Sequence, residues 1–189
     1  MAETRAGARP EQANTPARVF FALWPDAAAA AALQAQIPGL QQRFGGRAVP
    51  QEALHLTLAF LGSVERSRLP LLCELASRIE FSRFELQCDE LGEWQRQGIV
   101  WAGPSAIPAG LLRLREKLEV ALAEADFVLP AHRFVPHVSL LRGARCATRR
   151  EALTRPAGWA VSDFVLAESK LGPRGASYEL LWRSAAALK

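Results

Sequence analysis

The sequence predicts an α+β domain built from two similar lobes. Three observations support this fold class. An expected strand, helix and second strand occur twice in the same order, each second strand contains a histidine, and an expected hairpin follows each copy. The two histidines, His55 and His137, lie 82 positions apart, which is close to half of the expected ordered length. An internal duplication explains this spacing economically.

The first copy begins with the apolar run RVFFALWP at residues 18–25, which is typical of a strand. Pro25 and Asp26 then open an alanine-rich stretch to about Gln42 that predicts a helix. The second expected strand is LHLTLAFL at residues 54–61. A helix over residues 67–79 and a hairpin of FELQCDELGEW with GIVWAG complete the first copy.

The second copy repeats this order. GIVWAGP at residues 98–104 predicts a strand, and FVPHVSLL at residues 134–141 predicts the histidine strand. Residues 108–125 between them predict an amphipathic helix, because apolar residues recur on one stripe at Leu111, Leu114, Leu118 and Leu122. A weaker helical pattern covers residues 148–154, and VSDFVLAESKL with SYELLWRS predicts the final hairpin.

Composition limits the class of protein. The chain has 189 residues, of which 50% are hydrophobic and 22% are charged, as in an ordinary globular domain. We expect residues 1–17 to form a disordered tail and residues 18–189 to form one domain. No apolar run is long enough to span a membrane. The three cysteines form no CxxC pair, so the sequence predicts neither a disulfide framework nor a zinc knuckle and favours a cytoplasmic location.

The net charge of +4 comes mainly from arginine, whose planar guanidinium suits phosphate groups. This charge gives weak support for an anionic or nucleic-acid partner.

The two histidine motifs place polar groups on one face of each strand. Residues i and i+2 of a strand share a face, so His55 and Thr57 are expected to point the same way. His137 and Ser139 repeat this arrangement. On the opposite face of the first strand, the expected core residues are Leu54, Leu56, Leu58 and Phe60.

If the lobes pack about a pseudo-twofold axis, the two polar faces meet across one cleft. One histidine in a strand is more often a packed core group than a catalyst, but two in matching frames favour function. Two imidazoles and two hydroxyls suit phosphoryl transfer, with one imidazole accepting a proton and the other donating one. Neither motif contains a carboxylate or thiolate at ligand spacing, so no metal and no cofactor are expected.

The motifs HLTLAFLG and PHVSLLRG resemble those of the two-histidine phosphoesterases, and specifically the bacterial RNA 2′,3′-cyclic phosphodiesterases, also called 2′-5′ RNA ligases. RVFFALWP, GIVWAGP and FVLAESKLGPRGASYELLWR are also similar to this family, so the resemblance covers residues 18–184. It implies a bilobal α+β fold with two antiparallel sheets lining a central active-site cleft. It also implies a metal-independent hydrolase that converts an RNA or nucleotide 2′,3′-cyclic phosphate to a 2′-phosphate.

The resemblance also implies roles for individual residues. His55 corresponds to the proton donor for the departing 3′ oxygen, and His137 to the base that activates water. Thr57 and Ser139 correspond to phosphate-binding residues, with serine in place of the commoner threonine. Arg142 corresponds to an arginine that often follows the second motif. In a regular strand its side chain would point away from His137, and only a bulge or the strand end would bring it to the cleft.

Two other functions are compatible with these residues. The reverse reaction would join a 2′,3′-cyclic phosphate to a 5′-hydroxyl and form a 2′-5′ bond. A noncatalytic module that binds RNA ends would read the cyclic phosphate and release it intact. The presence of both histidines favours an enzyme over such a module. We expect the protein to act as a monomer on RNA ends or cyclic nucleotides.

Overall fold

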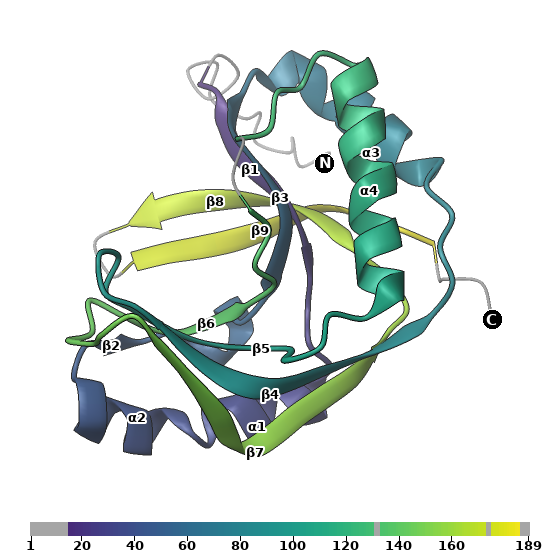
Figure 1. Ribbon diagram of the computed structural model, residues 1–189. Coiled ribbons are helices and arrows are strands. Elements are labelled where there is room, and N and C mark those ends of the chain that lie inside the picture. The colour runs from purple at the N-terminus through teal and green to yellow at the C-terminus, as the bar shows by residue number, and fades with distance from the viewer. Residues whose placement is uncertain (1–14, 131–132, 173–174, 186–189) are drawn as a thin grey trace, which may run out of the picture.

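The strands of the protein join in one antiparallel sheet (Figure 1). The computed structural model describes residues 15–130, 133–172 and 175–185. The sheet order is β7-β4-β5-β6-β3-β1-β8-β9, and the short strand β2 pairs with β6. The strands are β1 (Ala17–Leu23), β2 (Arg47–Ala48), β3 (Leu56–Val64), β4 (Phe84–Trp94), β5 (Ile99–Gly103), β6 (Val138–Arg142), β7 (Arg149–Val161), β8 (Val165–Gly172) and β9 (Gly175–Arg183).

The two halves of the sheet meet at β3 and β6, which are joined by one backbone pair, Leu56 with Val138. Each half of the sheet contains strands from both halves of the chain. Strand β4 follows the first histidine strand in the chain but pairs with β5, whereas β8 follows the second histidine strand and pairs with β1. The two copies of the duplicated pattern therefore exchange their outer strands, and the lobes expected from the sequence form parts of one continuous sheet.

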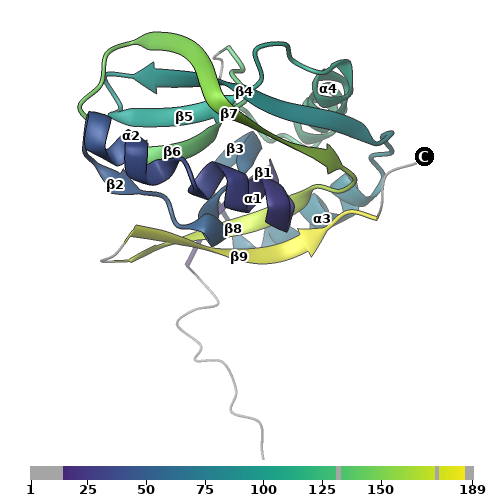
Figure 2. The same ribbon diagram turned by 90° about the horizontal axis from the view of Figure 1, so that it is seen from below.

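In the described part of the chain, four α-helices cover the sheet. Helices α1 and α2 lie on one side of the molecule and α3 and α4 on the other, as Figures 1 and 2 show. Helix α1 contacts β7, and α4 contacts α3 and β3. The helices are α1 (Ala27–Gln34), α2 (Ile37–Phe44), α3 (Leu69–Ser77) and α4 (Ala109–Glu124).

The residues at the beginning of helices α1 and α2 explain where these helices start. The carboxylate of Asp26 accepts a hydrogen bond from the backbone N–H of Ala29 at 2.8 Å, which caps α1 as its sequence predicts. The expected single helix to residue 42 is instead two helices. Pro38 lies in the first turn of α2 and has no N–H to continue the hydrogen-bond ladder of α1. Helix α1 therefore ends at Gln34, and helix α2 begins at Ile37.

Two apolar clusters pack against opposite faces of the sheet. The main core holds the buried stripe of α4, at Leu111, Leu114, Leu118 and Leu122, as predicted. A second, smaller cluster lies on the other face and contains Phe20, Ala22, Val165 and Ala167, with Trp24, Phe60 and Tyr178 against it. This second face carries the histidine motifs.

The structure differs from the expected elements at residues 148–154 and agrees with them at the two hairpins. Residues 148–154 are not helical, because Arg149–Val161 forms the edge strand β7 along β4. Strand β1 begins at Ala17, the last residue of the expected tail, and residues 1–14 of that tail lie outside the described residues. The two expected hairpins are confirmed as β4–β5 and β8–β9.

Candidate active site

The backbone pair between Leu56 and Val138 brings the two histidine motifs together. Because the strands are antiparallel, His55 lies opposite Ser139, and Thr57 lies opposite His137. The histidines therefore occupy diagonal positions, which in antiparallel strands are roughly 7–8 Å apart. Both side chains leave the sheet on the same face, so the two imidazoles are neighbours across the β3–β6 junction.

The two imidazoles are held in the same way. Nδ1 of His55 lies 2.8 Å from the carbonyl oxygen of Ala53, and Nδ1 of His137 lies 2.8 Å from the carbonyl oxygen of Val135. Because a carbonyl only accepts, each neutral ring carries its proton on Nδ1 and leaves Nε2 as a free acceptor. When a ring is protonated, Nε2 becomes a donor. The site thus has two equivalent atoms that can accept or donate one proton each.

Aromatic rings surround His55 on three sides. Trp24 stacks on it with ring centroids 5.0 Å apart, Phe20 is tilted at 4.9 Å, and Tyr178 meets it edge-on at 4.8 Å. The indole N–H of Trp24 also donates to the carbonyl of Glu52 at 3.2 Å, beside the turn that leads to His55. These contacts fix the orientation of the ring.

His137 has fewer aromatic neighbours. Trp94 meets its ring edge-on at a centroid distance of 4.5 Å, and Trp101 lies at 6.1 Å. Trp101 is fully buried and packs over Gly92 of the adjacent strand β4. The environments of the two imidazoles therefore differ, although their backbone hydrogen bonds match.

Burial lowers the pKa of both histidines. The pKa of His55 falls from 6.5 to about 4, mainly because burial removes water from the charged ring. The hydrogen bond to Ala53 opposes this shift, while the charges of Arg142 and His137 add to it. Burial also lowers the pKa of His137, against its bond to Val135 and with the charge of Arg142. Both imidazoles are thus mainly neutral near pH 7.

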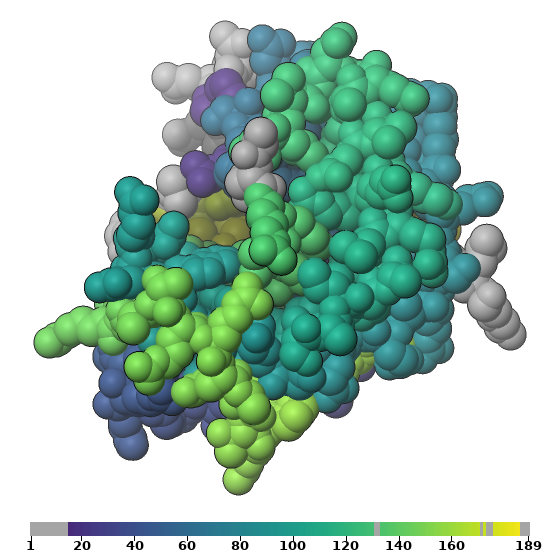
Figure 3. Space-filling view, in the orientation of Figure 1, coloured from purple at the N-terminus to yellow at the C-terminus, as the bar shows by residue number. Residues whose placement is uncertain are grey.

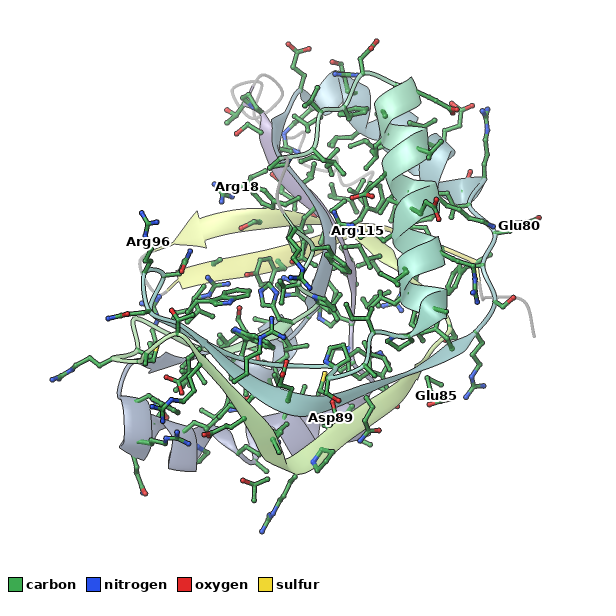
Figure 4. All side chains as sticks on the ribbon, in the orientation of Figure 1. Arg18, Glu80, Glu85, Asp89, Arg96 and Arg115 are labelled. Atoms are coloured by element: carbon green, nitrogen blue, oxygen red, sulfur yellow. The ribbon has the colours of Figure 1, made fainter. Side chains whose placement is uncertain are left out.

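Two hollows meet between the motifs, and part of this cleft is visible in Figure 3. The first, of about 490 Å³, contains His137 and is mainly apolar, with Arg115 reaching it from α4 (Figure 4). The second, of about 340 Å³, contains His55 and Arg142. Thr57 and Phe60 line both hollows, so the junction lies beside the first motif.

A bulge brings Arg142 to the cleft. Val100 pairs with Leu141 and Trp101 pairs with Ser139, so Leu140 has no partner in β5. The extra residue reverses the alternation of side chains after Leu140. The guanidinium of Arg142 therefore lies on the histidine face, contrary to the direction expected for a regular strand.

A second bulge overturns the expected position of Phe60. In the pairing of β1 with β3, Ala22 faces Thr57 and Phe21 faces Ala59, so Leu58 is the extra residue. The side chain of Phe60 consequently turns out of the main core and into the cleft. Leu54, Leu56 and Leu58 are buried in the main core as predicted.

Ser139 is half-buried opposite Trp101 and lines neither hollow. His132, the third histidine, lies outside the described residues. Trp24, Trp94 and Tyr178, which contact the two histidines, are not among the site residues expected from the motifs. Only Trp24 gave a signal, because it continues the alternation of Phe20 and Ala22 on the cleft face of β1.

Two further properties concern the described residues alone. No group of three His, Cys, Asp or Glu side chains in residues 15–130, 133–172 and 175–185 is arranged to hold a metal ion. In the same part of the chain, no helix has the length and apolar character needed to cross a membrane.

The chain is similar to several known proteins. A family model described as LigT-like phosphoesterase matches residues 23–101. The RNA 2′,3′-cyclic phosphodiesterase of Escherichia coli K12 is 36% identical over 143 residues, covering 73% of this chain and 78% of that relative. The enzyme of the same name from Thermus thermophilus is 33% identical over 175 residues, covering 87% of each.

Solved structures agree with these relatives. The crystal structure of Escherichia coli LigT complexed with 3′-AMP has a TM-score of 0.79 and 32% identity, covering 92% of this chain and 99% of that one. A Thermus thermophilus structure has a TM-score of 0.75 and 27% identity, covering 88% and 96%. The resemblance inferred from the motifs is confirmed: the chain belongs to the LigT-like phosphoesterase family.

Proposed function

We propose that the cleft hydrolyses RNA or nucleoside 2′,3′-cyclic phosphates to 2′-phosphomonoesters, with His55 as general acid and His137 as general base. The observation that supports this most directly is the matched pair of imidazoles. Each has Nδ1 held by a backbone carbonyl at 2.8 Å, which leaves both Nε2 atoms for proton transfer at diagonal positions of the β3–β6 junction.

In the proposed reaction, Nε2 of neutral His137 accepts a proton from water as the water oxygen attacks phosphorus. The bond between phosphorus and the 3′ oxygen breaks, and Nε2–H of charged His55 gives its proton to that oxygen. The product is a 2′-phosphomonoester with a free 3′-hydroxyl. Exchange with solvent then returns each histidine to its starting protonation state.

The anion itself supports this protonation pattern. Burial lowers the pKa values of both imidazoles, so His55 carries little charge near pH 7 before substrate binds. A phosphate anion between the rings favours their charged forms and raises both pKa values. Binding of the substrate therefore prepares the acid that the reaction needs.

Three further residues are proposed to hold the phosphate. The hydroxyls of Thr57 and Ser139 are the polar groups next to the histidines along their strands, and a hydroxyl donates to a nonbridging oxygen. The guanidinium of Arg142 lines the hollow that contains His55. Its positive charge opposes the negative charge that builds up on the oxygens in the transition state.

Incubation with adenosine 2′,3′-cyclic monophosphate tests the proposal. We expect 2′-AMP as the product, identified by chromatography against 2′-AMP and 3′-AMP standards. The 3′ isomer would contradict the assignment of the leaving oxygen. Tight binding with no turnover would instead favour a noncatalytic module that binds RNA ends.

One observation favours 2′-5′ ligation as a second candidate activity. The hollow beside His137 has a volume of about 490 Å³, whereas one water occupies about 30 Å³. The side from which the nucleophile enters therefore has room for a nucleoside with a 5′-hydroxyl. Incubating a cyclic-phosphate RNA with a 5′-hydroxyl RNA and looking for a 2′-5′ linked product tests this reaction.

We further propose that the natural substrate is an RNA with a 2′,3′-cyclic phosphate end, that the protein acts as a monomer in the cytoplasm, and that it needs no cofactor. Cys73, Cys88 and Cys146 are free thiols, which suits a reducing compartment. Light scattering of the purified protein tests the monomer.

A further inference from the structure

The hollow beside His55 is strongly basic. Its lining includes Arg18 from β1, Arg47 from β2 and Arg142 from β6, and among the described residues that line it there is no aspartate or glutamate. Within the described residues, none of these three arginines forms an ion pair. By contrast, Arg115 in the other hollow is paired with Glu119. Arg133 also lines that other hollow and forms no ion pair within the described residues, so the hollow beside His55 holds three such arginines and the hollow beside His137 holds one.

Two of these arginines face each other directly. Arg47 pairs with Arg142 in the β2–β6 ladder, so their side chains leave the sheet on the same face. Like charges at opposite positions of an antiparallel pair are destabilising without a counter-charge. The acidic residues on the neighbouring hairpin do not supply one, because Glu168 pairs with Arg66 and Glu179 with Lys170. This arrangement is suited to an anionic ligand.

Arg18 completes the basic rim. Its guanidinium lies 4.8 Å from the ring centroid of Phe60, which lines the junction of the two hollows. Figure 4 shows Arg18 on the side of the molecule where the β4–β5 turn lies. The hydroxyl of Ser169 and the ring of Tyr178 line the same hollow from the β8–β9 hairpin. Charged, hydroxyl and aromatic groups together suit a nucleotide with its phosphate.

The direction of the reaction places the RNA in this hollow. Attacking and leaving oxygens lie roughly in line across phosphorus. In the proposed function, on which this inference rests, His55 protonates the 3′ oxygen, so the terminal ribose lies on the His55 side. The chain that precedes this ribose continues from its 5′ oxygen through the next phosphodiester. Water enters from the opposite side, where His137 lies.

We propose that Arg18 and Arg47 bind the phosphodiester that precedes the terminal cyclic nucleotide, so that the site prefers RNA oligomers to cyclic mononucleotides. Arg142 lines the same hollow, and its charge acts on His55, so it serves the scissile phosphate. The preference arises from a second, nonreacting phosphate that a cyclic mononucleotide lacks.

Three substrates isolate that phosphate. They are adenosine 2′,3′-cyclic monophosphate, the dinucleotide ApA ending in a 2′,3′-cyclic phosphate, and the same dinucleotide with an uncharged methylphosphonate linkage. We expect kcat/KM of the wild type to be at least about tenfold higher for the charged dinucleotide than for the mononucleotide, as for charge-assisted contacts. The methylphosphonate dinucleotide should lose most of this advantage, because it keeps the extra base but not the charge.

Arginine variants locate the subsite. Arg18→Ala and Arg47→Ala should each lower the ratio of dinucleotide to mononucleotide kcat/KM by about threefold or more, and the double variant should bring it close to one. The salt dependence of the ratio should also weaken, by a log–log slope of at most about 0.7 in the double variant, because the dinucleotide carries one phosphate more than the mononucleotide. Arg96→Ala is the matched control, because Arg96 is exposed on the same side of the molecule but lines neither hollow.

The outcomes separate this inference from the proposed function. Hydrolysis of all three substrates at equal kcat/KM would overturn the subsite and leave the phosphodiesterase intact. A ratio that falls in Arg133→Ala but not in Arg18→Ala or Arg47→Ala would place the RNA in the other hollow, which Arg133 lines. An equal fall in Arg96→Ala would reduce the effect to general attraction of charge. Hydrolysis of none of the substrates would contradict both proposals.

Discussion

Leu56 and Val138 form the one backbone pair that joins the two halves of the sheet, and each immediately follows a histidine in the chain. This relationship sets the geometry of the site. Because both motifs share the spacing from histidine to hydroxyl, one antiparallel pair at the central residue places each imidazole opposite the hydroxyl of the other motif. The site is therefore built from backbone pairing, and the predictions below test its parts.

The two histidines should be required for catalysis and not for folding. His55→Ala and His137→Ala should each lower kcat for adenosine 2′,3′-cyclic monophosphate by about a hundredfold or more, the usual loss when a general acid or base is removed. Thermal unfolding of each variant checks that the fold is intact. A folded variant of either kind with near wild-type turnover would exclude the two-histidine mechanism.

Hydrolysis should survive removal of metal ions. The proposed proton transfers use Nε2 of two imidazoles, and neither motif supplies a carboxylate or thiolate ligand. Activity should therefore be unchanged after exhaustive dialysis against a chelator. Loss of activity that returns on addition of a divalent ion would assign the chemistry to a metal-activated water.

The rate profiles should depend on pH in two different ways. kcat/KM reports the free enzyme, in which burial lowers the pKa of His55 to about 4 and also lowers that of His137. The bell-shaped pH profile of kcat/KM should therefore have its optimum below the ordinary histidine pKa of 6.5. In kcat, the bound phosphate raises the pKa values of the coupled pair, so the optimum should move to higher pH. Coincident optima would contradict contact between the phosphate and both imidazoles.

The free energy of unfolding should decrease as the pH falls from 6.5 to about 4. The unfolded chain protonates His55 with a pKa near 6.5, whereas the folded chain does so at about 4. Between these values the unfolded state holds more protons, so the free energy of unfolding decreases as pH decreases. The full shift corresponds to about 3 kcal/mol. Urea unfolding at pH 7.5 and pH 4.5 should show a smaller loss in His55→Gln than in the wild type.

A methyl group added at Gly92 should disturb the support of His137. A Cβ there would lie 1.9 Å from Cζ2 of Trp101, so the indole must move. Overpacking of this kind costs about 1–3 kcal/mol, and displacement of Trp101 should also lower kcat. Gly39→Ala in α2 is the control, because nothing lies within 4 Å of its Cβ and alanine favours a helix. Equal effects of the two substitutions would contradict the close packing.

The local parts of the fold were predictable from the sequence. Alternation identified the shared face of His55 and Thr57, and the leucine stripe of α4 identified its buried side. These signals are local, because strand and helix periods depend only on neighbouring residues. The duplicated spacing then supplied one long-range fact, the meeting of the two motifs.

The remaining features depend on pairing between distant strands. Arg142 and Phe60 reach the cleft because of bulges, and a bulge is visible only when both strands are known. Residues 148–154 have weak helical character but extend because β4 offers an open edge of hydrogen-bonding groups. Arg18 and Arg47 line the same hollow as Arg142 from two different strands, and no spacing in the sequence indicates this.

The exchange of outer strands has a consequence for synthesis on the ribosome. Strand β1 is made before the other strands of the sheet, yet one of its two partners, β8, is made only after β7. Until residues 165–172 leave the exit tunnel, one edge of β1 has no native partner, and open edges promote aggregation. Chains truncated before β8 should therefore depend on chaperones, and folding should be slow because residues 19–22 pair with residues 165–168, which are distant in the sequence.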